Sequence, residues 1–205
     1  FRSAGCFTGF SVREEGNNVV VTANYKLGCF DQAVWTISPD GTAAIDFTYN
    51  FSGVVDLMGV MFDYPEDKVL SKRWVGDGPY RVWQNRLHGP QLGVWENEYN
   101  DPIPAESFTY PEFKGYFANV QWMTLETQEG MISICNRTPQ NYVGVYQPRD
   151  GRDGLLYTFP VTGISLMKVI PPVRNKVNTT DLIGPSSQAF WADGEYGGGI
   201  TLKFE

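Results

Sequence analysis

Short β-strand signals separated by turn signals recur along this chain of 205 residues, and helical periodicity is almost absent. Alternating or β-branched runs occupy residues 32–38 and 43–51, and Pro39-Asp40-Gly41 between them predicts the turn of a hairpin. Further runs are found at 17–25, 53–62, 68–75, 117–127, 130–135, 143–147, 155–160, 163–170 and 199–204. Because these strands are short and no internal repeat is seen, the pattern predicts a β-sandwich or a β-barrel.

Two stretches interrupt this rhythm, residues 76–114 and 171–198, and both are predicted to be long loops. Loops of this length in a compact domain are usually functional or disordered. Their aromatic content argues against disorder. It includes Trp83, Trp95, Tyr99, Tyr110, Phe190 and Trp191, and Tyr116 follows just after the first stretch.

Length and charge narrow the possible functions. A chain of this length is expected to form a single domain, residues 1–205. The net charge of -7 argues against a nucleic-acid partner, since such proteins use a basic face. No apolar run approaches the roughly 18 residues that a membrane-spanning helix needs, so no membrane span is expected.

The three cysteines, Cys6, Cys29 and Cys135, are too few and too widely spaced for a disulfide framework or a zinc knuckle. We expect them to be small buried apolar residues.

The sequence offers little for catalysis or for binding a cofactor. His88 is the only histidine, which excludes sites that need two imidazoles, and we expect it to be a surface residue. Asp150 and Asp153 are interpreted as parts of a surface turn, because the ligand spacing of a calcium loop is missing. The glycines at 197–199 precede a strand and therefore do not predict a phosphate loop. We expect no catalytic residue, metal or cofactor in this chain.

Carboxylates and aromatic rings leave more possibilities open. Glu96 and Glu98 would point to the same side of an extended segment, as a glycosidase pair requires, although exposed acids on a loop are the simpler interpretation. Aromatic rings flanked by polar side chains are typical of sugar sites, since a sugar has an apolar C–H face and a rim of hydroxyls. Trp74, at the end of a strand, is more readily explained as a core residue.

The segment Trp74-Val75-Gly76-Asp77-Gly78-Pro79-Tyr80-Arg81-Val82-Trp83-Gln84-Asn85-Arg86 resembles a segment of family 2 glycoside hydrolases. It is the Gly-x-Gly-Pro-x-Glu-x-Tyr-x-Asp-Arg segment in the C-terminal domain of the β-galactosidases. Arg81 stands where that pattern has Glu, and Asn85 where it has Asp. The hairpin at 35–47, the segment 110–115, which contains a Pro-Glu-x-x-Gly stretch at 111–115, and the position of Trp191 extend the similarity.

This resemblance implies an all-β, galactose-mutarotase-like supersandwich of twisted, mainly antiparallel sheets. It also implies that the chain is a C-terminal part of a larger glycoside hydrolase, whose catalytic glutamates lie on a TIM barrel that 205 residues cannot contain. Mutarotases of this fold use a histidine pair, so His88 alone argues against that activity.

In such enzymes a tryptophan of the last loop forms a platform for the sugar, and Trp191 would take this role, with Asp193 and Glu195 at the rim. The loop residues Gly76, Gly78, Pro79, Tyr80, Trp83, Asn85 and Arg86 are interpreted as scaffold. In that interpretation the glycines and the proline turn the chain sharply, Tyr80 and Trp83 pack beneath, and Arg86 fixes the loop by a charge-assisted hydrogen bond.

The expected function is therefore an accessory domain that helps a catalytic barrel to bind a galactoside. Two alternatives stay open. One is an independent carbohydrate-binding module. The other is a purely structural domain that mediates contacts between domains or within a homo-oligomer.

Overall fold

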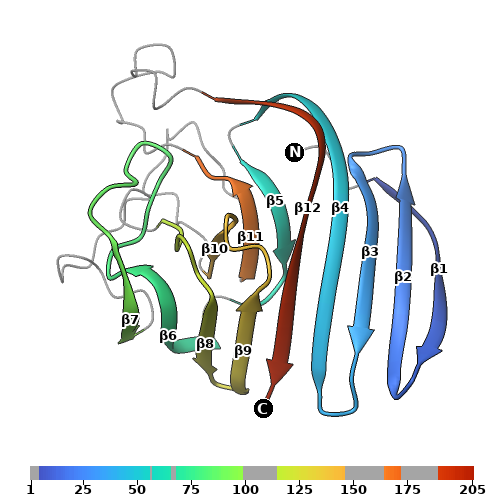
Figure 1. Ribbon diagram of the computed structural model, residues 1–205, viewed down its shortest axis with the longest axis horizontal. Helices are drawn as coiled ribbons and strands as arrows, with labels where there is room; N and C mark the ends of the chain where they lie inside the picture. Colours follow the sequence, from blue (N-terminus) through green and yellow to red (C-terminus); the bar gives the residue numbers. More distant parts are fainter. Residues whose placement is uncertain (1–4, 56, 66–67, 99–114, 146–163, 172–188) are drawn as a thin grey trace.

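The computed structural model describes residues 5–55, 57–65, 68–98, 115–145, 164–171 and 189–205, and these residues form two antiparallel β-sheets (Figure 1). The large sheet contains, in spatial order, β1 (Cys6–Glu15), β2 (Asn18–Lys26), β3 (Phe30–Ile37), β4 (Thr42–Val55), β12 (Phe190–Phe204), β9 (Gly130–Asn136), β8 (Trp122–Thr127), β6 (Val69–Gly78) and β7 (Gln91–Glu98). The small sheet contains β10 (Tyr142–Gly144), β11 (Ile164–Val169) and β5 (Met58–Phe62). The described residues include no α-helix, and the expectation of an all-β, antiparallel sandwich is confirmed.

The predicted hairpin is formed by β3 and β4, and its turn has the chemistry that the sequence indicates. Gly41 adopts a φ of 83°, in the left-handed region that glycine tolerates. The backbone N–H of Ser38 donates to the carbonyl oxygen of Thr42 at 2.8 Å. The side chain of Asp40 accepts from the N–H of Thr42 at 3.0 Å, and this bond lowers the pKa of the Asp40 carboxyl.

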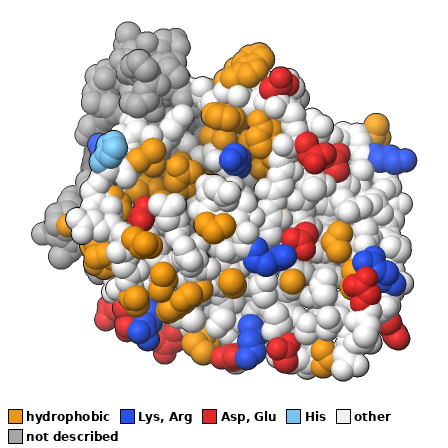
Figure 2. Space-filling view, in the orientation of Figure 1, with side chains coloured by type: hydrophobic (Ala, Val, Ile, Leu, Met, Phe, Trp, Pro, Cys, Tyr) orange, Lys and Arg blue, Asp and Glu red, His pale blue; other side chains and the backbone are white. Residues whose placement is uncertain are grey.

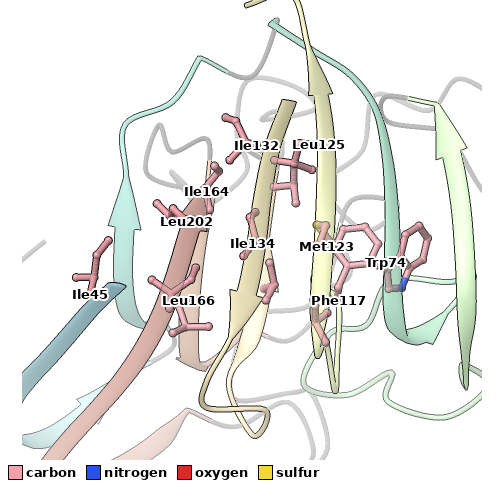
Figure 3. Close-up of a cluster of buried hydrophobic side chains, with 14 of the residues drawn as sticks. Ile45, Trp74, Phe117, Met123, Leu125, Ile132, Ile134, Ile164, Leu166 and Leu202 are labelled. Carbon is pink, nitrogen blue, oxygen red and sulfur yellow. The ribbon is translucent and has the colours of Figure 1, made fainter. Parts of the chain in front are cut away.

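The hydrophobic core lies between the large and the small sheet (Figure 3). Side chains at alternate positions of β4, β12, β9, β8 and β6 point to one face of the large sheet. Ile164 and Leu166 of β11 approach them from the small sheet, and Leu166 is completely buried. Trp74 is also completely buried, as predicted, and its ring lies edge-on to Phe117 at a centroid distance of 4.8 Å.

A row of aromatic rings continues from this core to the edge strand β1. Successive centroid distances are 6.5 Å for Phe47 and Phe30, 5.0 Å for Phe30 and Tyr25, 5.8 Å for Tyr25 and Phe7, and 6.4 Å for Phe7 and Phe10. Phe47 is buried, whereas Phe7 and Phe10 are 55% and 65% exposed. The apolar face of the large sheet therefore continues, at β1, into an exposed aromatic surface.

Several predicted boundaries are wrong, most clearly in the two supposed loops. β12 begins at Phe190 and not at 199, because β4 pairs with it from Phe190 to Lys203 and supplies backbone hydrogen bonds that need no favourable side chains. β7 lies within the supposed loop 76–114 and pairs with β6.

Other differences concern individual runs and the cysteines. The run 53–62 is divided between β4 and β5, which belong to different sheets, and the run 117–127 is a strand only from Trp122. The run 155–160 lies outside the described residues. Cys6 and Cys135 are exposed and Cys29 is half-buried, so the expectation of buried cysteines is wrong. No segment of the described residues forms a helix long and apolar enough to cross a membrane.

The replacement Leu166→Ala tests the junction between the sheets. We expect it to lower the free energy of unfolding by about 2–5 kcal/mol, because it removes a fully buried side chain and leaves a cavity. Urea unfolding followed by tryptophan fluorescence measures this change. Leu27→Ala is the control, since Leu27 is 93% exposed and its truncation should change stability by less than about 0.5 kcal/mol. A loss in Leu166→Ala no larger than in the control would contradict this account of the core.

Candidate functional site

Three of the side chains singled out in the sequence lie on one face of strand β12. Trp191, Asp193 and Glu195 are exposed at alternate positions, and side chains two residues apart in a strand point to the same face. Ala192 and Tyr196 occupy the opposite parity and contribute to the hydrophobic core. Trp191 is 66% exposed, which is unusual for so large an apolar side chain. The structure thus brings the three predicted residues together, although on a strand and not on a loop.

Strand β4 provides a second row of side chains beside them. The β4 residues opposite these three are, in the same order, Val54, Ser52 and Asn50, and all are exposed. Neighbouring strands lie about 4.8 Å apart, so the two rows form one continuous strip. The strip is apolar at the end that holds Trp191 and Val54, and further along it offers carboxylate, hydroxyl and amide groups. This combination suits a ligand with an apolar face and a hydroxyl rim.

The β4 residues of this strip were not predicted from the sequence. Their signal is the alternation of exposed polar residues in β4, but assigning them to Trp191 and its neighbours requires the register between β4 and β12. The local sequence of two strands that lie more than a hundred residues apart does not determine the register in which they pair.

The backbone beneath the strip is held from the core side. The hydroxyl oxygen of Tyr196 accepts from the backbone N–H of Asp193 at 2.9 Å. The Tyr196 ring stacks on Tyr49 of β4 at a centroid distance of 5.7 Å. Burial, together with the nearby phenol of Tyr196 and thiol of Cys29, raises the pKa of Tyr49 to about 12. Tyr49 therefore stays neutral at ordinary pH, and the position of Asp193 is linked to the core.

The glycines at 76 and 78, in the segment 74–86, make close packing contacts. Gly76 and Gly78 lie in β6, and the indole ring of Trp95 in β7 lies against Gly78. A methyl group at Gly78 would lie 2.6 Å from Cδ1 of Trp95. The indole Nε1–H of Trp95 donates to the carbonyl oxygens of Gly76 and Gln91, both at 3.2 Å. A side chain at Gly78 would displace the ring, and a methyl group at Gly76 would lie 2.9 Å from Cα of Val120. These close contacts support a scaffold role for both glycines.

The end of β6 and the chain after it are joined to the segment 116–120 by hydrogen bonds. Asp77 N donates to Ala118 O at 2.9 Å, and Val82 N and O bond to Tyr116 O and N at 2.7 and 2.9 Å. Asn119 Nδ2 donates to the carboxylate of Asp77 at 2.7 Å. The Tyr116 phenol is buried, and burial raises its pKa.

The remaining predicted loop residues agree only in part with the expected packing. The strand continues through Gly78, so the bend lies at Pro79 and Tyr80 and not at residues 76–79. Trp83 is buried as expected, whereas Tyr80 is 47% exposed and does not pack beneath the loop.

The loop closes through backbone hydrogen bonds between Trp83 and Arg86, at 2.9 and 3.3 Å. The Arg86 side chain is exposed, and among the described residues its guanidinium has no partner, so the expected charge-assisted bond is not found there. Asn85 is half-buried.

The other candidate residues named in the sequence are exposed or lie outside the described residues. Glu96 and Glu98 do lie on the same face of β7, where they are exposed and stand opposite Arg73 and Ser71 of β6. His88 is exposed. Tyr99, Tyr110, Asp150 and Asp153 lie outside the described residues. Within the part of the chain that the structure describes, no three His, Cys, Asp or Glu side chains are grouped so that they could hold a metal ion.

The strip residues of β12 and the glycines of β6 belong to different parts of the large sheet, since β12 lies between β4 and β9 while β6 and β7 form one edge (Figure 1).

Comparison with protein families gives a match to the beta galactosidase small chain over residues 5–165. The chain belongs to the β-galactosidase small-chain family. The match includes the scaffold segment 74–86 and ends before β12. No curated protein matches the chain.

The replacement Gly78→Ala tests the scaffold role of the glycines in this family member. We expect a loss of about 1–3 kcal/mol in the free energy of unfolding, because the new methyl group overlaps the Trp95 ring. Urea unfolding measures it. Val94→Ala on β7 is the control, since Val94 is 60% exposed and its loss should change stability by less than about 0.5 kcal/mol. A Gly78→Ala protein as stable as the unmodified chain would show that the ring moves aside without cost.

Proposed function

We propose that this chain is an accessory domain of a β-galactosidase, and that the strip around Trp191 contributes to the sugar-binding site of a catalytic barrel outside this chain. Membership of the β-galactosidase small-chain family supports the enzyme class. The observation that carries the assignment of the strip is the exposure of Trp191 on the same strand face as two carboxylates.

The exposed indole ring of Trp191 is stabilised when a ligand covers its apolar face. A ring that is 66% exposed keeps a large apolar face in water, and a sugar ring can cover it with its C–H face. Asp193 and Glu195 lie about 7 and 13 Å further along the strand, by the usual rise per residue, and carboxylates accept hydrogen bonds from sugar hydroxyls. Both kinds of contact are needed to orient a sugar, and the strip offers both.

In this proposal the chain binds and orients, and its partner supplies the reacting groups. Hydrolysis of a galactoside requires a pair of carboxylates flanking the glycosidic bond. Trp191, Asp193 and Glu195 would act by holding the substrate in position over the partner's carboxylates, which reduces the entropy that the transition state must lose. The chain without its catalytic partner is therefore expected to be inactive.

The test is Trp191→Ala in the enzyme that contains this chain together with its catalytic partner. We expect kcat/KM for lactose to fall about ten-fold, which corresponds to about 1.4 kcal/mol of lost transition-state stabilisation. Trp191→Phe should retain part of the activity, because a smaller ring still stacks. Steady-state kinetics on lactose and on an aryl galactoside measure both variants.

Trp122→Ala is the matched control for this experiment. Trp122 is also an exposed tryptophan, at 38%, but it lies on β8 and pairs with Cys135 of β9, away from the strip. Its variant should keep the original kinetics. If Trp191→Ala also kept them on every galactoside, the platform role would be wrong.

The exposed aromatic surface at β1 favours a second, structural role for a different part of the chain. Phe7, Phe10 and Val12 are 55%, 65% and 56% exposed, and apolar side chains gathered in this way usually mark contacts with another protein surface. We propose that this surface packs against the partner that carries the active site.

The double variant Phe7→Ser with Phe10→Ser tests this contact. We expect association with the catalytic partner to weaken at least about ten-fold, because buried aromatic anchors at an interface contribute about 2 kcal/mol or more each. Sedimentation of the mixed chains measures association, and Leu92→Ser is the control, since Leu92 is 68% exposed on the opposite edge strand. Unweakened association in the double variant would exclude this surface as the contact.

A further inference from the structure

A shallow groove of about 370 Å³ lies on the outward face of the large sheet, further along β12 from the strip around Trp191. This volume lies within the range of about 300 to 1,000 Å³ that is common for small-molecule sites. The pairing of three strands arranges its floor in two rows. One row contains Gln32, Thr48 and Gly197, and the other contains Val34, Asp46 and Gly199. Figure 2 shows that on the face it presents, charged side chains gather over β1–β3 and along the lower edge, and hydrophobic ones over β6–β9.

The glycines of β12 form the lowest part of the groove. At Gly197 and Gly199 the outward position carries no side chain, whereas Thr48 and Asp46 project from β4 beside them. A methyl group at Gly199 would lie 2.8 Å from Oδ1 of Asp46 and 3.0 Å from Cζ of Arg137. Glycine is therefore required at 199 for the Arg137 side chain to cross β12.

Arg137 forms the wall of the groove on the side of β9. Its Nη2 donates to Oδ1 of Asp46 at 2.8 Å and to the carbonyl oxygen of Ile45 at 3.1 Å. Its backbone N–H donates to Gly199 O at 2.9 Å, and the Thr138 hydroxyl accepts from Gly199 N at 2.9 Å. These bonds fix the guanidinium in place, and the two side chains of the ion pair remain 38% and 56% exposed.

The charges and polar groups of the groove favour one class of ligand. Arg137 and Asp46 neutralise each other, and the exposed Glu195 next to Gly197 on the same strand face disfavours an anion. Of the two carboxylate oxygens of Asp46, only Oδ1 has a partner among the described residues, which is Arg137. The Thr48 hydroxyl has no hydrogen-bond partner among these residues. An acceptor, a donor and a hydroxyl thus face the groove above an apolar floor of glycine Cα atoms and Val34.

We propose that this groove is a second saccharide-binding site, separate from the strip around Trp191. It takes a neutral sugar ring with adjacent hydroxyls, one donating to Asp46 and another accepting from Arg137, while the C–H face lies on Gly197 and Gly199. The geometry of the groove is independent of the proposed function. Only the choice of a saccharide, among neutral polyhydroxyl ligands, rests on that proposed function.

The test is a titration of the 205-residue chain with lactose, followed through its backbone amide and indole N–H signals by NMR. We expect the amide signals of residues 197–199 to shift saturably, with an apparent Kd of about 1 to 10 mM, because a shallow site makes few contacts. The Thr48→Val variant removes one hydroxyl while keeping the shape, and should weaken this binding about two- to ten-fold. Val34→Phe should abolish it by filling the floor of the groove.

Thr36→Val is the matched control, since Thr36 lies on the same strand as Val34 but outside the groove, and it should bind like the original chain. The unchanged remainder of each spectrum verifies folding. Glycine signals that do not move at the highest lactose concentration, or that move equally in Val34→Phe, would overturn the proposal. The indole signal of Trp191 reports on the strip separately, so a shift there without a shift of the glycines would refute the groove and leave the proposed function standing.

Discussion

The pairing of β4 with β12 determines where the strip around Trp191 and the groove at Gly197 and Gly199 lie. The two strands are joined from Phe190 opposite Val55 to Lys203 opposite Thr42, and β12 also pairs with β9 near its end. Since side chains alternate between faces, this one register assigns Trp191, Asp193 and Glu195 to the outward face and Ile200 and Leu202 to the core. A slip of one residue would exchange the two sets, which would expose the core and bury two carboxylates. The hydrophobic core therefore fixes the position of the polar strip.

Glycine has an unfavourable entropy in strands, about 0.5–1 kcal/mol relative to alanine, and two of the strand glycines here make close contacts that offset this cost. At Gly78 the compensation is the Trp95 ring, which packs against the backbone and hydrogen-bonds across it. At Gly199 it is the Arg137 side chain, which crosses the strand to reach Asp46. Both glycines allow a large side chain to lie on the backbone, but the first closes a packed scaffold while the second leaves an open groove.

Local sequence signals predict the parts of this fold that are locally determined. The turn at Pro39-Asp40-Gly41 and the burial of Trp74 follow from residue chemistry over a few positions. The close contacts of Gly76 and Gly78 do not, because they are made with the distant segment 118–120 and with Trp95. The first half of β12 does not, because residues 190–199 contain four glycines and are strand only through their pairing with β4. The common face of Trp191 and Asn50 likewise depends on a register between distant strands. Exposure of Cys135 is another consequence of strand parity, since it lies opposite Trp122 on the outward face.

The two exposed aromatic regions of the chain differ in a way that separates recognition of a small ligand from contact with a protein. Trp191 stands beside Val54 and is followed along the strand by acids, so its surroundings are mostly polar and suit a ligand that is itself half polar. The rings at β1 continue a row that begins in the core at Phe47, and the centroids of neighbouring rings remain within 6.5 Å throughout. Apart from the Tyr25 hydroxyl, such a row has no polar group to orient a sugar. It presents an apolar surface at a sheet edge, where a partner can both pack against the rings and cover the open strand. The chemistry of the two regions thus supports the proposal that β12 contributes to sugar binding and that β1 contacts the catalytic partner.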